Sequence, residues 1–459
     1  MKKSETILII GGGLCGSLLA LRLAQRGYTI NIYEGRPDLR TTDISAGRSI
    51  NLALSNRGLK ALRLAGVAEK AKAICIPMYG RMMHDAKGNT FESNYSGRKG
   101  EYINSISRGD LNGILLTEAE KHENVTIHFN KKCLGVDIEN SRATFESYKT
   151  KEPFTIQADV IFGTDGAGSS LRKSYEKQLP GFKVSQEFLT HGYKELEIPG
   201  INRKHQISKD HLHIWPRGDY MLIALPNMDG SFTVTLFLSY SEGAYNFDNL
   251  KSKEKITEFF KRDFPDTLEL IPDIFHEFTT NPTGALGTVK CSPWAYKGNT
   301  LIMGDAAHAI VPFYGQGMNA SFEDVAELDA VIDLYQGDWE RIFSEFQKER
   351  KKNADAIADL AIDNYYEMRD HVANEFFIQK RIIEMALERE FPSTYFSKYS
   401  LVTFNEHLGY HQAMTKGRAQ DKVLLEMIEE REIKNTTPTK KILEEVQNRS
   451  EKLLNIQNE

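Results

Sequence analysis

The stretch "TILIIGGGLCGSLLALRLAQRGYTINIYEGR", residues 6–36, decides the fold. Thr6–Ile10 is a short apolar run rich in β-branched residues, of the kind that is buried in a parallel sheet. Leu14, Leu18 and Leu21 then recur at helical spacing, and a second apolar run follows. The stretch therefore predicts a strand, a glycine turn, a helix and a second strand, which together form a βαβ unit.

The glycines of this turn have a spacing with a mechanical meaning. Gly11, Gly13 and Gly16 form G-x-G-x-x-G, in which the first allows the tight turn, the second lets the backbone approach a pyrophosphate, and the third lets the helix pack closely on the strand. Glu34 ends the second strand, where an acid can accept hydrogen bonds from an adenosine ribose. A chance glycine turn is the alternative, but strand, helix and acid occur in the required order. The stretch predicts a dinucleotide site without distinguishing a flavin from a diffusible nicotinamide.

Two further apolar runs also end in glycine and aspartate. Residues 160–162 lead to Asp165-Gly166, and residues 300–303 lead to Gly304-Asp305. Both acids are expected at the ends of strands, where ligands collect in open α/β sheets. Turn and cap chemistry explains either pair taken alone. Together with the glycine fingerprint, the two pairs indicate a dinucleotide site.

A helix is expected to begin near Met318, directly after the turn Gly315-Gln316-Gly317. Apolar residues follow at helical spacing, namely Phe322, Val325, Leu328 and Ile332. The amide end of a helix is partly positive, and glycines let a flat ring system come close. An isoalloxazine, whose pyrimidine edge becomes anionic on reduction, would suit that place. Asp305 would then hold one part of a long dinucleotide, and the turn with its helix would hold the redox end.

Residues 183–283 have a different pattern, because their alternating segments are typical of a mostly antiparallel sheet with one covered face. Leu225 and Phe237 either face a substrate there or are plain core residues. The segment "YGRMMHDAKGNTFESNY" resembles a hairpin with its turn centred near Gly88, which would bring Arg81 opposite Tyr95. A guanidinium beside a phenol is suited to binding a carboxylate. An exposed cross-strand pair is the alternative.

From about residue 337 to the end, the sequence predicts charged helices. Leu360, Asn364 and Met368 lie on one helix face, so Asn364 interrupts an apolar stripe and either caps a neighbouring backbone or faces a ligand. The last 23 residues, "TPTKKILEEVQNRSEKLLNIQNE", predict a solvated amphipathic helix, with an interaction surface as the alternative.

The expected fold class is α/β, with a Rossmann-like dinucleotide-binding domain, an inserted, mostly antiparallel β-sheet domain and a helical C-terminal region. The expected boundaries are 1–75, 100–182 and 284–336 for the dinucleotide-binding domain, 76–99 and 183–283 for the inserted domain, and 337–459 for the helices.

Composition excludes several function classes. A formal net charge of -5 with scattered basic residues disfavours nucleic acid as a partner. The four cysteines contain no CxxC pair, which argues against zinc and against a disulfide framework. No run reaches 18 apolar residues, and the first apolar run leads into glycines instead of a cleavage site. We therefore expect a cytoplasmic protein without a metal or a membrane anchor, and its oligomeric state stays open.

Several motifs together resemble a known family. With the glycine fingerprint, "TDGAGSSLR" (164–172) and "GDAAH" (304–308) in that order, the chain resembles the FAD-dependent aromatic hydroxylases of group A, which have the para-hydroxybenzoate hydroxylase fold. The segments "GRSINLALSNRG" (47–58), "GRMMHDAKG" (80–88), "NSISRGDLN" (104–112) and "NYYEMRD" (364–370) look more specifically like the kynurenine 3-monooxygenase family.

The resemblance implies a reaction and a set of binding residues. The reaction would be hydroxylation of L-kynurenine to 3-hydroxykynurenine with NADPH and O2, through the C4a-hydroperoxide of a tightly bound, non-covalent FAD, in tryptophan degradation. FAD would lie on Gly11, Gly13, Gly16, Glu34, Arg108, Asp305, Met318 and Asn319, beside Asp165 and Gly317 from the spacing above. The kynurenine carboxylate would lie on Arg81, Tyr95 and Asn364 with Tyr399 near, and the ring would contact Leu225, Phe237, Phe313 and Met368.

Since the flavin carries the chemistry, no catalytic side chain is expected, and NADPH would dock transiently. Family members from eukaryotes carry a C-terminal membrane anchor, which this polar C-terminus does not resemble. The alternatives left open are a group A hydroxylase of another aromatic acid, a flavin halogenase or reductase on the same fold, and a flavin-binding sensor without turnover.

Overall fold

The computed structural model describes residues 5–42, 51–370, 375–433 and 436–457. The chain forms two compact units, which are each assembled from three segments. The first unit comprises Met1–Cys75, Ile106–Leu189 and Leu286–Ala358, and the second comprises Ile76–Ser105, Thr190–Ala285 and Asp359–Glu459. The helical segment, expected as one region from residue 337, is divided between the two units after residue 358.

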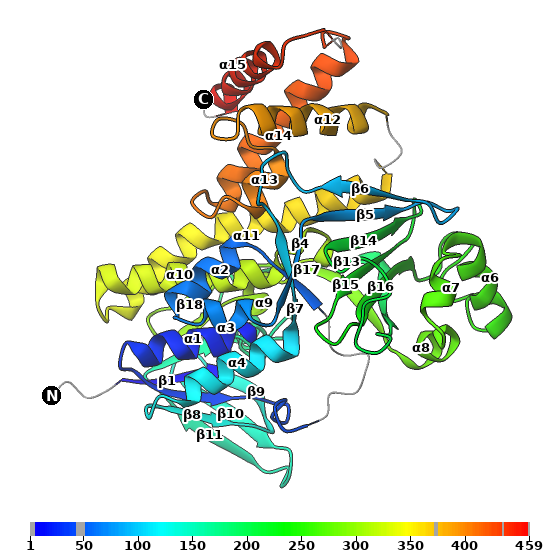
Figure 1. The fold of residues 1–459 in the computed structure, drawn as a ribbon. Helices are drawn as coiled ribbons and strands as arrows, with labels where there is room; N and C mark the ends of the chain where they lie inside the picture. Colours follow the sequence, from blue (N-terminus) through cyan, green and yellow to red (C-terminus); the bar gives the residue numbers. More distant parts are fainter. Residues whose placement is uncertain (1–4, 43–50, 371–374, 434–435, 458–459) are drawn as a thin grey trace. The chain divides into compact units, whose positions relative to one another are not determined.

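A six-stranded sheet with the order β18-β19-β12-β1-β2-β8 forms the centre of the first unit (Figure 1). All neighbouring strands run parallel except β18, which is antiparallel to β19. The strands are β1 (Thr6–Ile10), β2 (Thr29–Tyr33), β8 (Val125–His128), β12 (Val160–Gly163), β18 (Ala295–Tyr296) and β19 (Thr300–Ile302). Because the chain leaves β1 to β2 on one side while β12 pairs on the other, the carboxyl end of β1 is a topological switch point, where open α/β sheets bind ligands.

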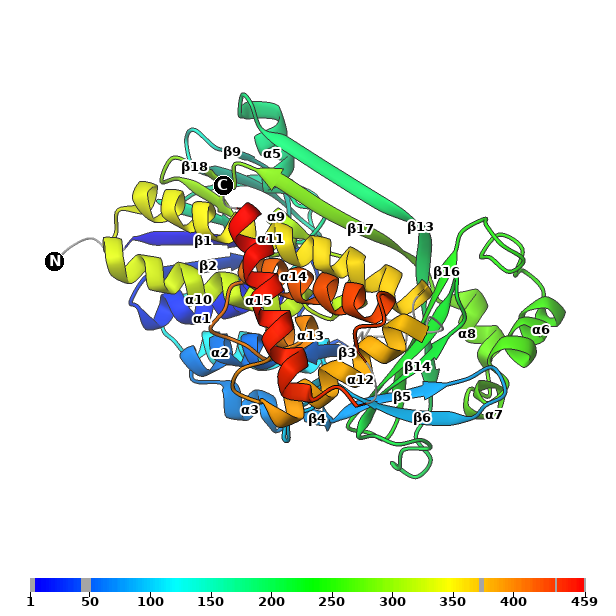
Figure 2. The same ribbon diagram turned by 90° about the horizontal axis from the view of Figure 1, so that it is seen from above.

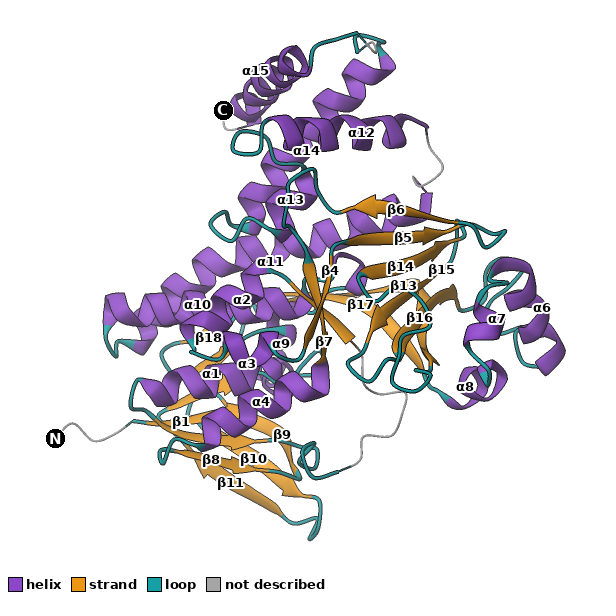
Figure 3. Ribbon diagram, in the orientation of Figure 1, coloured by secondary structure: helices purple, strands orange, loops and turns teal. Residues whose placement is uncertain are grey.

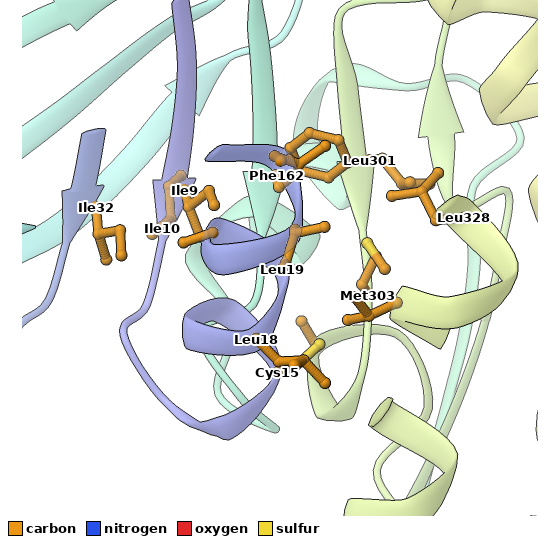
Figure 4. Close-up of a cluster of buried hydrophobic side chains, with 14 of the residues drawn as sticks. Ile9, Ile10, Cys15, Leu18, Leu19, Ile32, Phe162, Leu301, Met303 and Leu328 are labelled. Carbon is orange, nitrogen blue, oxygen red and sulfur yellow. The ribbon is translucent and has the colours of Figure 1, made fainter. Parts of the chain in front are cut away.

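The core of this unit explains why the glycine turn has a fixed position. Figure 4 shows side chains of β1, the helix α1 (Leu14–Gln25), β12, β19 and the helix α10 (Gly317–Tyr335) gathered in one cluster. Leu18, Phe162, Leu301 and Leu328 have no exposed surface in this cluster. The apolar runs that predicted the strands and helices are therefore the runs whose side chains are buried in this core. Their burial fixes the ends of β1, β12 and β19, which are followed by the glycine turn and by the polar residues Asp165 and Asp305.

The remaining elements of the first unit surround this sheet. They are β3 (Asn51–Leu54), α2 (Asn56–Leu64), α3 (Ala68–Lys72), α4 (Arg108–Glu120), β9 (Lys131–Asp137), β10 (Arg142–Ser147), β11 (Pro153–Gln157), α5 (Ser170–Gln178), α9 (Asp305–His308) and the 3-10 helix η1 (Pro312–Tyr314). Strands β9, β10 and β11 form a separate antiparallel sheet. The elements β4 (Cys75–Met78), β7 (Ile103–Ser107), β13 (Lys183–Ile198), β17 (Thr283–Ser292) and α11 (Trp339–Asp370) each have residues in both units.

The second unit contains a seven-stranded sheet with the order β17-β13-β16-β15-β14-β5-β6. Its other strands are β5 (Gly80–His84), β6 (Thr90–Asn94), β14 (His211–Pro216), β15 (Met221–Pro226) and β16 (Phe232–Ser239). The sheet is mostly antiparallel, as the alternation in 183–283 predicts, with one parallel pair between β14 and β5.

Three short helices cover one face of this sheet (Figure 2). They are α6 (Lys253–Asp263), α7 (Thr267–Leu270) and α8 (Ile274–Thr280). The side chains of Leu222, Leu236 and Phe259 are completely buried between the sheet and these helices. Because successive side chains of a strand point to opposite faces, the residues between these positions point to the other face of the sheet.

The C-terminal part of the chain is helical, as expected (Figure 3). After α11 come α12 (Glu375–Glu390), α13 (Lys398–Thr403), α14 (Tyr410–Glu429) and α15 (Thr439–Gln457). The terminal helix α15 is amphipathic, and its Ile442, Leu443 and Val446 are buried in a cluster with Leu387 and Leu424. The apolar face of α15 is thus used inside the fold. Across the described ranges, no helix combines the length and apolarity that crossing a membrane requires.

Candidate functional site

The glycine turn after β1 is tightly packed on the side that faces the fold and open on the opposite side. Gly11 has a φ of +98°, and a Cβ on Gly16 would lie 2.1 Å from the carbonyl oxygen of Gly11. A Cβ on Gly13, by contrast, would meet no atom within 4 Å. The first amides of α1 begin at this open side and have no acceptor inside their helix. The turn therefore has the features expected of a cradle for a pyrophosphate.

Glu34 follows β2 and holds this turn with its buried carboxylate. Its Oε2 accepts a hydrogen bond from the backbone N–H of Gly12 at 2.8 Å, and its Oε1 accepts from the backbone and side chain of Arg36 at 2.8 and 2.9 Å. Burial alone raises the pKa of a carboxyl, but these partners lower the pKa of Glu34 below its usual value. An ionised carboxylate offers about four acceptor positions, so Glu34 can also accept from a ribose hydroxyl.

Asp165 lies just after β12 and has one carboxylate oxygen available. Its Oδ2 accepts from the backbone N–H of Ser170 at 2.6 Å. Its Oδ1 is buried and has no hydrogen-bond partner in the described part of the chain. Burial raises the pKa of this carboxyl. A buried oxygen without a partner is costly, so Asp165 is suited to accept a hydrogen bond from a bound molecule.

The turn before α10 is built by Asn319. The side chain of Asn319 accepts from the backbone N–H of Ser55 at 2.9 Å, and it donates to the carbonyl oxygens of Ala53 and Gly315 at 2.8 and 3.0 Å. Helix α10 begins at Gly317, close to the predicted Met318. The Asn319 side chain is therefore occupied in shaping the turn, and the backbone N–H groups at the start of α10 are what this segment offers to a ligand.

A buried ionic network, which the sequence reasoning missed, fixes the Gly304-Asp305 segment. Asp324 is fully buried and accepts from the backbone N–H of Gly304 at 2.9 Å, from His308 at 2.6 Å and from Arg350 at 2.9 Å. Glu323 binds Arg350 at 2.7 Å and Arg57 at 2.8 Å. Although burial raises the pKa of Asp324 by itself, the charges of His308 and Arg350 lower it below the usual value. The network ties α10, α11 and α2 to the start of α9, which carries the exposed Asp305.

Together these features fit FAD. The glycine cradle, the open side at Gly13, the unpartnered oxygen of Asp165 and the amide end of α10 offer donors and acceptors of the kinds that its phosphates, ribose and ring edge need. Arg108, the first residue of α4, and Asp305, the first residue of α9, are exposed and carry charges of opposite sign. All residues expected to bind the cofactor lie in the first unit.

The second unit brings Arg81, Tyr95 and Tyr399 together. The rings of Tyr95 and Tyr399 stack with centroids 5.7 Å apart and an interplanar angle of 8°. The guanidinium carbon of Arg81 lies 5.3 Å from the Tyr95 ring centroid and 4.7 Å from that of Tyr399. Among the described residues, Arg81 has no carboxylate partner, and the buried hydroxyl of Tyr95 has no hydrogen-bond partner. This cation and hydroxyl are thus available to an anion.

The hairpin that presents Arg81 exists, but its expected register was wrong. Arg81 pairs with Ser93, and Tyr95 lies just beyond the last residue of β6. The reason is the turn: the side chain of Asp85 accepts from the backbone N–H groups of Lys87 and Asn89, both at 2.8 Å. The turn therefore centres one residue earlier than predicted, and Gly88 supplies positive φ at its end. Contact between Arg81 and Tyr95 is made outside the strand pairing.

Arg81, Leu225 and Phe237 point to the same face of the seven-stranded sheet, the face opposite α6–α8. The strand pairs that establish this are Arg81 with Leu212, Ile214 with Ile223, and Met221 with Phe237. Leu225 and Phe237 are 7% and 2% exposed.

The end of α11 lies on this same face, because the ring of Tyr365 is 5.9 Å from that of His191, which shares the face. Asn364, beside Tyr365, is buried and has partners within the fold. Phe313 is buried in the first unit, and the side chain of Met368 lies outside the described residues.

Comparisons with known proteins show which family the chain belongs to. The family described as an FAD binding domain matches residues 4–361. The chain is 45% identical over 428 residues to a kynurenine 3-monooxygenase of Myxococcus xanthus (strain DK1622), covering 93% of this chain and 91% of that protein. It is 43% identical over 456 residues to one of Flavobacterium psychrophilum, covering 99% and 100%, and 44% identical over 439 residues to one of Dictyostelium discoideum, covering 93% of each.

Solved structures share the fold at lower identity. The tetrameric form of 2-methyl-3-hydroxypyridine-5-carboxylic acid oxygenase has a TM-score of 0.64 at 21% identity, covering 86% of this chain and 99% of that one. P. aeruginosa PqsL in complex with 2-aminobenzoylacetate has a TM-score of 0.64 at 17% identity, covering 80% and 97%. With the site geometry and the much closer relatives above, the chain belongs to the kynurenine 3-monooxygenase family of FAD-binding proteins.

Proposed function

We propose that this protein hydroxylates L-kynurenine to 3-hydroxykynurenine with NADPH and O2, in the degradation of tryptophan. The observation that carries the proposal is the Arg81 guanidinium, which lies over two stacked tyrosines without a carboxylate partner among the described residues. The names of the close relatives support the choice of kynurenine.

Arg81 and Tyr95 bind the amino-acid end of the substrate. A guanidinium and a carboxylate form charge-assisted hydrogen bonds, and the planar fork of arginine fixes the orientation of the carboxylate. The Tyr95 hydroxyl is buried, and burial raises its pKa well above the usual value, with a further contribution from Tyr399. Tyr95 therefore stays protonated and acts as a donor. The substrate carboxylate satisfies both groups, each of which is costly to leave unpaired.

The apolar face that carries Arg81 receives the aromatic ring. Leu225 and Phe237 share this face, and a ring held against apolar side chains excludes water from its surface. The amino group of the kynurenine ring already donates electrons to the carbon that is hydroxylated, so no side chain has to deprotonate the substrate. The protein's contribution is a fixed substrate pose and a dry environment.

FAD supplies the redox chemistry when it is bound, by accepting a hydride from NADPH and activating O2. The residues that would hold it are those of the glycine turn, Glu34, Asp165 and the amide end of α10, whose hydrogen bonds are described above. None of these side chains has to transfer a proton to the substrate. Binding and orientation are their whole task.

The proposal is tested on the purified, FAD-loaded protein. NADPH oxidation is measured with and without L-kynurenine, and the product is identified by mass spectrometry. We expect kynurenine to stimulate NADPH oxidation and the product to contain one additional oxygen on the ring. Anthranilate and phenolic acids are run in parallel. Stimulation and oxygenation by one of these, but not by kynurenine, would assign the site to another aromatic acid, and no stimulated turnover by any of them would contradict a hydroxylase.

A variant connects this activity to Arg81. Arg81→Ala leaves the substrate carboxylate without its charged partner, so we expect kynurenine binding to weaken by about 2 to 4 kcal/mol, with FAD affinity unchanged. The matched control is Arg262→Met, because Arg262 also lies over a tyrosine, 4.2 Å from the ring centroid of Tyr245. Equal kynurenine affinity in both variants would remove Arg81 from the site.

A further inference from the structure

Glu388 on α12 has an unusual set of partners for a buried acid. Its side chain has no exposed surface. Its Oε2 accepts from the backbone N–H of Gly97 at 2.9 Å, while its Oε1 accepts from the backbone N–H of Ser397 at 2.9 Å and from Arg98 at 3.2 Å. Burial alone raises the pKa of a carboxyl, but hydrogen bonds from Ser400, Gly97 and Ser397 lower the pKa of Glu388 below its usual value.

The two backbone amides that Glu388 binds lie at equal distances in sequence from the two tyrosines of the proposed site for the substrate carboxylate. Gly97 is two residues after Tyr95, and Ser397 is two residues before Tyr399. These two tyrosines stack on each other, and Arg81 lies over both rings. One carboxylate therefore connects the two chain segments, 300 residues apart, that form the walls around the guanidinium.

The same helix holds the Tyr95 segment at a second point. Arg381 donates to the carbonyl oxygen of Tyr95 at 2.5 Å and to that of Asn94 at 3.0 Å. Gly97 lies so close to α12 that a Cβ on it would be 2.2 Å from the carbonyl oxygen of Met385. Helix α12 thus fixes the backbone on both sides of the Tyr95 ring.

Only a carboxylate can make the connection at Glu388. Two backbone N–H groups approach its two oxygens, so both oxygens must accept. A glutamine of the same shape has one accepting oxygen, and its amide group would face an N–H donor. An apolar side chain would leave both amides without a partner in the interior, which is costly. The main task of this charge is therefore to accept the two backbone hydrogen bonds, and the ion pair with Arg98 contributes less to the connection.

We infer that Glu388 is a positioning residue for the substrate carboxylate, and that Arg381 on the same helix supports it. Glu388 does not touch the substrate. By holding the amides of Gly97 and Ser397, it sets the distance between the Tyr95 and Tyr399 rings and so keeps Arg81 pre-oriented. This inference rests on the proposed function, because it concerns the same kynurenine site.

The test is Glu388→Gln in the full-length, FAD-loaded protein. The dissociation constant of L-kynurenine is measured from the change that it causes in the flavin absorbance spectrum, and kcat, KM and FAD affinity are measured beside it. We expect the kynurenine Kd and KM to rise by about tenfold or more through lost pre-organisation. We expect kcat to stay within about twofold and the FAD Kd to be unchanged, because the first unit keeps its contacts.

The matched control is Asp263→Asn, which also neutralises a buried carboxylate in the second unit. Asp263 accepts from Arg262 and from Tyr220 at 2.8 Å. This control should lower the melting temperature without changing the kynurenine Kd. A kynurenine Kd in Glu388→Gln that matches the control or the unmodified protein would overturn the positioning role.

A second variant keeps the test decisive if Glu388→Gln does not fold. Arg381→Met removes the bonds to Asn94 and Tyr95 from a partly exposed position, and it should raise the kynurenine Kd several-fold with the FAD Kd unchanged. An unchanged kynurenine Kd in this variant would overturn the inference while the proposed function stands. If the unmodified protein itself gives no spectral response to kynurenine and no stimulated turnover, the proposed function falls and the inference with it.

Discussion

Two glycines of the fingerprint, three residues apart, should fail in different ways when each is replaced by alanine. A methyl group on Gly16 would lie 2.1 Å from the carbonyl oxygen of Gly11 and 2.5 Å from the hydroxyl of Thr164. A methyl group on Gly13 would meet nothing within 4 Å, and the φ of -71° and ψ of -174° at Gly13 are allowed for alanine. Gly16→Ala therefore perturbs the fold itself, whereas Gly13→Ala perturbs the space that the cofactor enters.

The magnitudes follow from these distances. Real Cβ contacts are essentially never below 3.0 Å, so Gly16→Ala forces the backbone to move by nearly 1 Å, and we expect it to lower the free energy of unfolding by about 3 kcal/mol, the upper end of overpacking effects. Gly13→Ala loses only a preference at the helix N-cap, about 1 kcal/mol or less. Its methyl group stands in the way of the pyrophosphate, so FAD affinity should fall roughly 10- to 100-fold, or about 1.4 to 2.7 kcal/mol.

Two assays separate the effects. Urea unfolding of the FAD-free protein gives the free energy of unfolding, and quenching of FAD fluorescence gives the FAD Kd. Gly13→Ala should unfold nearly like the unmodified protein and bind FAD poorly, and Gly16→Ala should unfold at clearly lower urea. The assignment of Gly13 to the pyrophosphate would be refuted by normal FAD affinity in Gly13→Ala, and the packing role of Gly16 by normal unfolding of Gly16→Ala.

Two further predictions concern one acid in each unit, the fully buried Asp324 and the half-buried Glu277. Asp324→Asn leaves Arg350 without a full counter-charge in the interior, so urea unfolding should show that the free energy of unfolding falls by about 3 kcal/mol or more. The exposed control Asp333→Asn should lower it by roughly 0.5 kcal/mol. Similar losses in both variants would contradict the network. Burial raises the pKa of Glu277 to about 7, so its contribution to stability is present at acidic pH and lost as pH rises through 7. Glu277→Gln should therefore be more stable than the unmodified protein at pH 8 and not at pH 5, by about 1 to 2 kcal/mol after solvent screening, and a difference independent of pH in urea unfolding would count against it.

The parts of the fold that the sequence predicted are those decided by local patterns. The βαβ unit at residues 6–36, the strand before Asp165 and the start of α10 depend on apolar periodicity and on glycines within about ten residues of each other. Such signals are written in one segment. Most of the residues that we expect to bind the cofactor belong to these segments, which is why local patterns could propose them.

The register of the hairpin and the buried charges were beyond this reasoning. The hairpin register depends on which backbone N–H groups donate to the Asp85 side chain. A turn centred on Gly88 and a turn built by the Asp85 side chain are both compatible with the composition of this segment. Glu323 and Asp324 lie between the apolar residues of a predicted helix, and this was the one sequence signal that indicated buried charges. Their partners Arg57 and Arg350 are 266 and 26 residues away in sequence, and nothing local selects them.

Two of the buried carboxylates that the sequence did not reveal, Asp324 and Glu388, have the same kind of task. A buried ion pair is seldom more stable than apolar residues of equal volume, so their presence is not explained by stability alone. Each of them accepts a hydrogen bond from a backbone N–H in a segment that carries residues proposed to bind a ligand: Asp324 from Gly304, and Glu388 from Gly97 and Ser397. An apolar side chain can fill the same space but cannot fix a loop by its amide. In each unit, a buried acid thus lies where a segment must keep one conformation. The arginines and the histidine around these acids neutralise a charge that would otherwise be costly to bury.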